Sequence, residues 1–270
     1  MHFFKYHGTG NDFVCIDNQK GNISLSANQI QFLCDRHFGI GADGVILMEK
    51  SQNGGDIFMN YYNADGTTAE MCGNGVRVTA RFAVERWKNM QKEILVDTRS
   101  GIKPVFVLEN HFYQVNMGIP KFLSADFPEK SQEIFGQEWH FASMGNPHAI
   151  GFFGDETSMN KYFSLYAGKI ESLTELFPKK INVNFVVKRG AQHFFVKTYE
   201  RGAGPTLACG TGASGSFAWI LKKFPECVEK KVQLDIPGGV LLFEMSAKGE
   251  VLMSGPAELV FEGEIENIRI

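Results

Sequence analysis

The chain has 270 residues, of which 44% are hydrophobic and 21% charged, and its net charge is −3. This composition is typical of an ordinary globular protein, and the lack of a basic excess argues against binding to nucleic acid or to an anionic membrane. We expect neither a signal peptide nor a membrane span, because no basic and apolar leader and no long apolar stretch is present.

The cysteines are odd in number and lack CxxC spacing, which argues against a disulfide framework and against a zinc site. Free thiols persist in a reducing compartment, so we expect a cytoplasmic protein. The five positions are Cys15, Cys34, Cys72, Cys209 and Cys227.

In the first half, residues 2–17 predict a strand, a glycine-rich turn and a second strand. A helix is predicted over residues 26–38, because Ser26 and Gln29 form a capping-box pattern and Gly39 is a stop signal. Further strands are expected over residues 45–48, 56–63, 94–98, 101–108 and 111–117. The residues expected in the core of the first strands and helix are Cys15, Ile30, Leu33, Cys34 and His37.

In the second half, residues 122–138 carry no clear pattern, and a helix is predicted over residues 155–166. Strands are expected over residues 139–153 with a turn at 145–148, then over 181–187, 193–200, 232–236, 240–245 and 250–254. Residues 256–270 alternate between apolar and polar. We expect them to return to the first sheet, which otherwise lacks a closing strand.

One motif occurs twice. Cys72-Gly73-Asn74-Gly75 returns 137 residues later as Cys209-Gly210-Thr211-Gly212, and a tyrosine lies ten residues before each cysteine. The apolar positions that follow match in the same frame: Val76, Ala80, Ala83 and Trp87 against Ala213, Phe217, Ile220 and Phe224. The repeat predicts two similar domains, 1–117 plus 257–270 and 118–256, each with a cysteine at the start of a buried helix.

A cysteine in that position has a chemical use. The unpaired N–H groups and partial positive charge of a helix N-terminus favour the thiolate and lower the thiol pKa. The same N–H groups can bind a substrate carboxylate, and the flanking glycines let it come close. Two such thiols facing each other across an interdomain cleft would remove a proton from one face of a carbon and deliver one to the other.

The sequence resembles the diaminopimelate epimerase family along nearly its whole length. The motifs that carry the resemblance are HGTGNDFVCID, FGIGADG, NADGTTAEMCGNG, GNPH, INVNF and ERGAGPTLACGTGA. The resemblance implies an α/β (α+β) fold of two pseudo-symmetric domains, each a mixed, mostly antiparallel sheet curled around a central helix. It implies a cofactor-independent isomerase, with neither metal nor pyridoxal phosphate, that interconverts LL- and meso-2,6-diaminopimelate in lysine and peptidoglycan biosynthesis.

The resemblance also implies roles for individual residues. Cys72 and Cys209 would be the acid–base pair, supported by His148 and Glu200. Gly44 departs from the pattern, because some members carry a substrate-contacting Gln there. The resemblance implies a homodimer and a small-molecule substrate. The implied substrate contacts are Asn11, Asn63, Gly73, Asn74, Asn146, Asn182, Glu200, Arg201, Gly210 and Thr211.

Three other functions compete with this interpretation. Proline racemases and hydroxyproline epimerases share the cysteine pair but typically read CGHG where this chain has CGNG, and Glu200-Arg201 favours a substrate with a distal amino-acid head. A thiol redox protein would leave the glycines and asparagines unexplained. A two-lobed amino-acid-binding protein would not need a thiol in both halves.

Overall fold

The computed structural model describes residues 1–266. It divides into two compact units, Met1–Val115 together with the chain from Ser254 onward, and Asn116–Met253. These boundaries lie within three residues of the expected ones. The part of the first-domain prediction that covers residues 267–270 lies outside the described residues.

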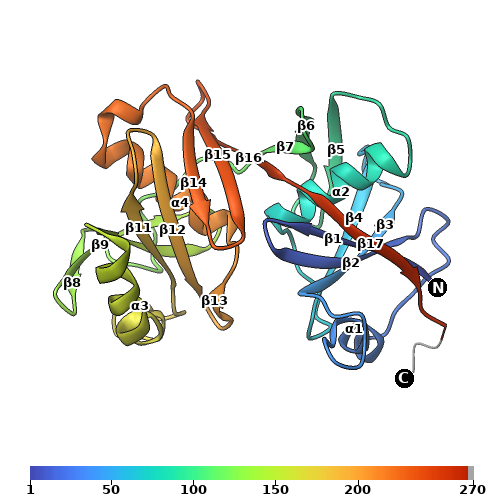
Figure 1. Cartoon of the computed structure of the whole chain (residues 1–270), viewed down its shortest axis with the longest axis horizontal. Coiled ribbons are helices and arrows are strands. Elements are labelled where there is room, and N and C mark those ends of the chain that lie inside the picture. Colours follow the sequence, from blue (N-terminus) through green and yellow to red (C-terminus); the bar gives the residue numbers. More distant parts are fainter. Residues whose placement is uncertain (267–270) are drawn as a thin grey trace. The chain divides into compact units, whose positions relative to one another are not determined.

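The first unit is a mixed sheet whose strand order is β17–β1–β2–β3–β4–β5–β6–β7 (Figure 1). The β2/β3 and β4/β5 pairs are parallel and the others antiparallel. A helix connects the strands of each parallel pair, as parallel pairing requires a crossover. The elements are β1 (His2–Gly8), β2 (Asn11–Asp17), α1 (Ala27–Cys34), β3 (Gly44–Glu49), β4 (Ile57–Asn63), α2 (Gly73–Glu85), β5 (Glu93–Asp97), β6 (Lys103–Val107), β7 (Phe112–Asn116) and β17 (Glu258–Glu264).

The second unit repeats this arrangement with the order β8–β9–β10–β11–β12–β14–β15. Its parallel pairs, β10/β11 and β12/β14, fall at the same places in the order. The elements are β8 (Gln132–Ile134), β9 (Gln137–Ser143), β10 (Pro147–Phe153), α3 (Glu156–Glu171), β11 (Asn182–Lys188), β12 (His193–Glu200), β13 (Gly204–Thr206), α4 (Gly210–Lys223), the 3-10 helix η1 (Pro225–Cys227), β14 (Val232–Ile236), β15 (Gly239–Met245) and β16 (Val251–Pro256).

The last strand closes the first sheet. β17 pairs antiparallel with β1, with Phe3 opposite Gly263, and so holds the place that β8 holds in the second unit. The expectation that the C-terminal stretch returns to the first sheet is therefore confirmed for residues 258–264.

Each sheet curls around one helix. α2 packs against β1, β4, β5 and β6, while α4 packs against β9, β10, β11, β12 and β14. Strands far apart in the sheet thus meet one helix, which is buried over most of its length, from Gly73 to Ala83 in α2. The predicted fold class is confirmed.

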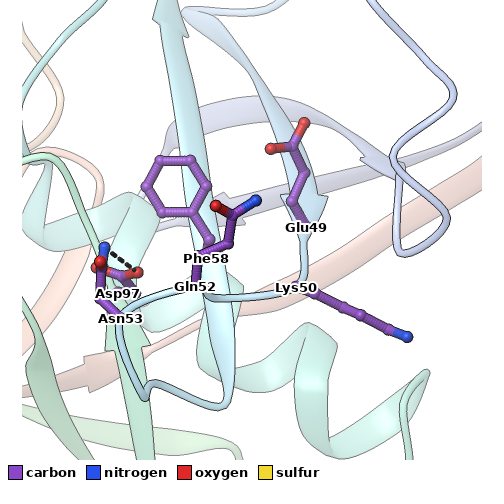
Figure 2. Close-up of a pocket in the computed structure, with 6 residues that line it drawn as sticks. All are labelled: Glu49, Lys50, Gln52, Asn53, Phe58 and Asp97. Carbon is purple, nitrogen blue, oxygen red and sulfur yellow. Dashed lines mark hydrogen bonds between the residues drawn. The ribbon is translucent and has the colours of Figure 1, made fainter.

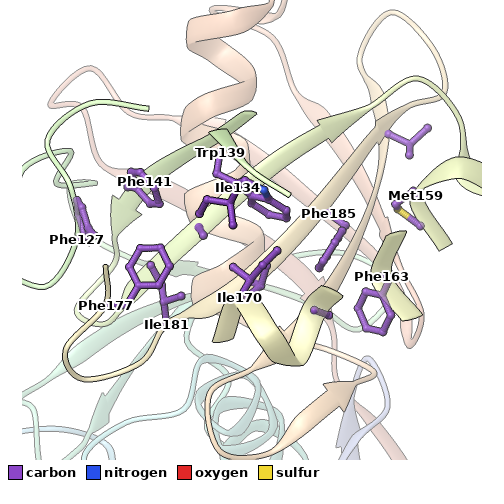
Figure 3. Close-up of a cluster of buried hydrophobic side chains, with 14 residues drawn as sticks. Phe127, Ile134, Trp139, Phe141, Met159, Phe163, Ile170, Phe177, Ile181 and Phe185 are labelled. Carbon is purple, nitrogen blue, oxygen red and sulfur yellow. The ribbon is translucent and has the colours of Figure 1, made fainter. Parts of the chain in front are cut away.

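The other helices cover the outer faces. In the second unit α3 packs Phe163 and Ile170 against Trp139 and Phe185 (Figure 3), and the Trp139 and Phe185 ring centroids lie 5.2 Å apart. In the first unit Leu33 of α1 lies in a cluster with residues of β2 and β3. Apolar burial on both faces of each sheet gives each unit its own core.

Two helices end at other positions than predicted. The capping box of Ser26 and Gln29 is confirmed, but α1 ends at Cys34 rather than at residue 38. The reason is Asp35, whose Oδ1 accepts the N–H groups of His37 and residue 38 at 2.7 and 2.8 Å and forms a turn instead. His37 is consequently exposed, and its predicted place on the buried face is wrong. In the second unit, α3 runs on to residue 171, past its predicted end at residue 166.

The remaining cysteines are buried away from the helix N-termini. Cys15 and Cys34 lie in the core, as predicted. Cys227, which carried no signal in the sequence, is fully buried and its thiol donates to the carbonyl of Ala191 at 3.3 Å. None of the five cysteines, all of which lie within residues 1–266, forms a disulfide.

Candidate active site

Both motif cysteines are helix N-caps. Cys72 precedes α2 and Cys209 precedes α4, each with an extended backbone and without a side-chain capping bond. Each thiol therefore lies at the end of a helix whose first N–H groups have no intrahelical acceptor. The prediction that each cysteine begins a buried central helix is confirmed.

In the first unit, two amides surround the thiol. Asn11 Oδ1 accepts a hydrogen bond from the Cys72 thiol at 3.5 Å and another from the Asn74 amide at 3.1 Å. The Asn11 amide nitrogen donates to Asp43 Oδ2 at 2.8 Å, and this bond fixes which end of the amide faces the thiol. The structure thus brings together Asn11, Cys72 and Asn74.

Asn63 and Gly44 are neighbours across β4 and β3. The Asn63 amide nitrogen donates to Thr67 Oγ1 at 3.0 Å, so the Asn63 side chain is held by the turn that follows β4. A Cβ atom on Gly44 would lie 2.5 Å from Cε2 of Tyr61 and 2.6 Å from the Tyr62 carbonyl oxygen. The Tyr61 ring therefore occupies the space into which a longer side chain at position 44 would extend.

In the second unit the thiol is more deeply placed. Cys209 is 7% exposed, and its Sγ lies 3.6 Å from Thr211 Oγ1. Burial raises the pKa of this thiol, the Glu200 carboxylate raises it further, and bonds from Thr211 and the Gly212 N–H only partly oppose them. The Gly212 N–H at the helix N-terminus lowers the pKa of Cys209, as expected, but desolvation and the Glu200 charge outweigh it.

His148 is fully buried, and both ring nitrogens have partners. Nε2 lies 3.0 Å from Asn146 Oδ1, and Nδ1 lies 3.1 Å from the Asn184 amide nitrogen. Asn184 Oδ1 accepts from Thr198 at 3.0 Å, so its amide nitrogen is the donor and the His148 proton is on Nε2. Burial, with the charge of Arg201, lowers the pKa of His148 to about 3, so the ring is neutral and orients Asn146.

Asn182 anchors the loop that follows β12. Its amide nitrogen donates to the Pro147 carbonyl at 2.9 Å, and its Oδ1 accepts the Arg201 N–H at 3.0 Å. Buried Glu171 accepts the next N–H, from Gly202, at 3.1 Å. These bonds set the position of Glu200 and Arg201 at the end of the strand.

The groups around each thiol form a half-site, and two residues of these half-sites were missed from the sequence. Asn184 holds His148, and Arg77 holds Asn74. Gly212 of the repeated motif packs so closely against Cys209 and Asn184 that a Cβ atom would overlap the Asn184 amide oxygen. Signals for them existed: Asn184 is a polar residue in an apolar strand, and Arg77 is a charge within an apolar helix.

Chemically, each half-site offers one thiol, several neutral amides and the N–H groups of a helix start. Such a set can exchange a proton and hold a carboxylate. A surface pocket of about 280 Å³ in the first unit lies elsewhere (Figure 2). Its carboxylate Asp97 already accepts from Ser51 and Asn53 at 2.7 and 3.0 Å, and it includes none of the predicted site residues.

Comparisons with known proteins agree with the repeat. A family model described as diaminopimelate epimerase matches residues 3–123 and again residues 140–260, which are 137 residues apart. A diaminopimelate epimerase of Carboxydothermus hydrogenoformans is 39% identical over 279 residues, covering 98% of this chain and 99% of its own. The Leptospira biflexa diaminopimelate epimerase is 38% identical over 284 residues, with the same coverage.

Among solved structures, a phenazine biosynthesis protein of the PhzF family from Bacillus anthracis superimposes with a TM-score of 0.71. It is 17% identical, and 99% of each chain is covered, so this likeness concerns the fold alone. Within residues 1–266, no helix has the length and apolar character needed to cross a membrane.

Proposed function

Because the chain belongs to the diaminopimelate epimerase family and is an isomerase of that family, we propose that Cys72 and Cys209 are the two bases of its reaction, the interconversion of LL- and meso-diaminopimelate. The observation that carries the proposal is the N-cap cysteine of the central helix in both halves of the repeat. A reaction that inverts a carbon needs one proton donor and one acceptor, and the repeat supplies two equivalent groups.

In the proposed reaction one thiolate takes the α-proton from one face of the substrate carbon. The C–H electron pair passes into the carboxylate, which the helix N–H groups stabilise as negative charge develops. The other thiol then gives its proton to the opposite face. One C–H bond is broken and one formed, and the two cysteines have exchanged protonation states.

Binding and orientation would come from the polar residues around each thiol. His148 acts by holding Asn146, and Glu200 and Arg201 recognise the charged groups of the distal amino-acid head. This assignment is supported by the bonds that fix Asn146 and the Arg201 backbone. The proposed substrate contacts are Asn11, Asn63, Gly73, Asn74, Asn146, Asn182, Glu200, Arg201, Gly210 and Thr211.

The experiment is proton exchange at the α-carbon. Reduced protein is incubated with LL-diaminopimelate in deuterated water, without added cofactor, and deuterium uptake and stereochemistry are followed by NMR. We expect deuterium to enter with inversion, and Cys72→Ser and Cys209→Ser each to abolish turnover. Cys227→Ser is the matched control, because a serine hydroxyl can keep the bond to Ala191.

Other outcomes separate the alternatives. Exchange with hydroxyproline or proline but not with diaminopimelate would assign the protein to the sister activity. If the α-proton of no amino acid exchanges with solvent, a redox role or simple amino-acid binding would explain the cysteines better.

We also propose that the protein is a homodimer of the cytoplasm. Five cysteines that form no disulfide within residues 1–266 suit a reducing compartment. Light scattering should give a mass near twice 30.2 kDa, and a mass of one chain would refute the dimer.

A further inference from the structure

The turns that follow β4 and β12 are equivalent in the two halves of the repeat, and each is bonded to the outer helix of its unit. In the first unit, the Gln31 amide nitrogen of α1 donates to the carbonyl oxygen of Asp65 at 2.7 Å. In the second, Glu171, the last residue of α3, accepts the N–H of Gly202 at 3.1 Å. Residues 65 and 202 lie 137 positions apart, which is the offset of the repeat. The same place in the turn is therefore held by a neutral amide in one half and by a carboxylate in the other.

Glu171 occupies a position that is unfavourable for a carboxylate. It is 5% exposed, and it ends a helix, where the partial negative charge of the helix C-terminus opposes an anion. The same oxygen, Oε1, accepts from the Gly202 N–H and from the Lys180 ammonium, the latter at 3.3 Å. Lys180 is half exposed, so water screens the ion pair. The bond to Gly202 is thus the contact that needs an oxygen at this buried place.

The turn is held through two consecutive backbone N–H groups. The N–H of Arg201 donates to Asn182 Oδ1 at 3.0 Å, and the N–H of Gly202 donates to Glu171. Gly202 has φ of +76°, in the left-handed region that favours glycine, so the backbone turns sharply here. Two side chains from different elements therefore fix successive peptide planes, and these planes set the direction in which Glu200 and Arg201 leave the turn.

The end of α3 also lies close to the strand that leads into the turn. A Cβ atom on Gly168, one turn before Glu171, would lie only 3.0 Å from the Tyr199 hydroxyl oxygen of β12. The side chain of Arg201 reaches the segment that follows α3, where its Nη1 donates to the Lys179 carbonyl at 3.1 Å. Both the backbone of the turn and the Arg201 guanidinium are thus supported by α3 and the residues directly after it.

We propose that Glu171 is a positioning residue that determines specificity for the distal amino-acid head, because it holds the turn from which Glu200 and Arg201 extend. The inference rests on the proposed function, which assigns recognition of that head to these two residues. Glu171 itself does not contact the substrate. It fixes the peptide plane between Arg201 and Gly202, so a change in its length alters affinity for the head more than proton transfer at the α-carbon.

Two substitutions separate the length of the Glu171 side chain from its charge. Glu171→Gln keeps the length and an oxygen that can accept the Gly202 N–H, whereas Glu171→Asp keeps the charge but is one methylene group shorter. We expect Glu171→Asp to raise KM for diaminopimelate by about tenfold and to lower kcat by less than about threefold, because the shorter carboxylate loses the bond to Gly202. Glu171→Gln should keep both constants within about threefold of the native values.

A role in the ion pair with Lys180 predicts the opposite order, because the charge would matter and the length would not. A native KM in Glu171→Asp, or a larger rise in Glu171→Gln than in Glu171→Asp, would therefore overturn the proposal. A loss confined to kcat would also contradict it.

Amide hydrogen exchange without substrate reports on the turn directly. We expect Glu171→Asp to speed exchange in residues 200–204 by about tenfold and to leave residues 63–67 at their native rates. Gln31→Asn is the matched control, because it shortens the equivalent side chain of the first half by the same methylene group. It should leave residues 200–204 unchanged. Native exchange of residues 200–204 in Glu171→Asp would overturn the proposal.

A double-mutant cycle tests whether Glu171 acts through the turn. In a protein that carries Arg201→Met, Glu171→Asp should raise KM by a smaller factor than in the native background, because one of the two groups that it positions is already lost. Equal factors in the two backgrounds would show that Glu171 acts independently of Arg201 and would contradict the inference.

Amide exchange and turnover separate this inference from the proposed function. Faster exchange of the turn in Glu171→Asp, in a protein that exchanges no amino-acid α-proton, would refute the proposed function and support the role of Glu171 in holding the turn. Normal turnover with a native KM in Glu171→Asp would refute the inference alone.

Discussion

Neutral amides set the orientation of the groups around both thiols. Asn11 is fixed by Asp43 in the first unit, and His148 is fixed by Asn184 in the second. A buried amide that is fully bonded has one orientation, because reversing it would leave donors facing donors. The single proton position on His148 follows from this arrangement.

Gly212→Ala should damage the second half-site more than Gly75→Ala damages the first. A Cβ at position 212 would overlap the Asn184 oxygen and lie 3.2 Å from Cys209 Sγ, whereas at position 75 it would meet the mobile end of Met59 at 3.2 Å. We expect Gly212→Ala to cost about 1–3 kcal/mol of unfolding free energy and most of the activity. Urea unfolding and α-proton exchange of both variants test this. Equal losses in the two would refute it.

His148 should make stability depend on pH. Its folded pKa, about 3, lies below the unfolded value, so the unfolded chain takes up the proton first as pH falls through about 6.5. Stability is thereby lost on acidification, by about 2 kcal/mol between pH 7 and pH 5. His148→Gln should remove this part of the dependence, measured by urea unfolding at both pH values. Exposed His37→Gln is the control and should leave the slope unchanged.

At the scale of elements, the closing strand joins the two ends of the chain. β17 lies beside β1, so the first sheet is complete only when the last strand has been made. Without β17, β1 would be an open edge with unpaired backbone groups, and such edges promote aggregation.

In a chain that ends at residue 257, the amides of β1 and β2 should therefore be less protected against hydrogen exchange. We expect faster amide hydrogen exchange in residues 2–17 and greater aggregation, while the residues of β9 and β10 in the second unit keep their native rates. If β1 kept its native exchange rates in the shortened chain, β17 would not be needed to stabilise the first sheet.

At the scale of the whole molecule, each unit has a separate core. Phe185 lies in the core of the second unit, with ring centroids 4.9 Å from Phe163 and 5.2 Å from Trp139. Leu47 occupies the matching strand position in the first unit and is also buried. Phe185 belongs to a hydrophobic cluster in the second unit and Leu47 to one in the first, and the two clusters have no residue in common.

Phe185→Ala and Leu47→Ala should each destabilise mainly their own unit. Removing these buried side chains costs about 3–5 and 2–5 kcal/mol respectively, from lost burial and the cavity left behind. Hydrogen exchange measured by mass spectrometry should show the loss in β9–β12 for Phe185→Ala and in β1–β4 for Leu47→Ala. Equal loss in both units for either variant would mean that they unfold as one.

Much of this protein is determined by patterns that are local in the chain. Alternating strands, the capping box at Ser26 and the repeated cysteine motif each depend on a few neighbouring residues, so these patterns predicted most elements and the cysteines at both helix starts. The fold class was implied by the resemblance to a known family. Helix ends were less predictable, because a single side chain such as Asp35 can redirect the backbone.

The environment of each thiol was decided only by tertiary structure. Whether a pKa rises or falls depends on burial and on charges brought from elsewhere in the chain, and both depend on distances that only the folded chain sets. The repeat makes Cys72 and Cys209 equivalent in sequence. Folding brings Asn11 to Cys72 and Glu200 to Cys209, and it pairs Asn184 with His148 across neighbouring strands.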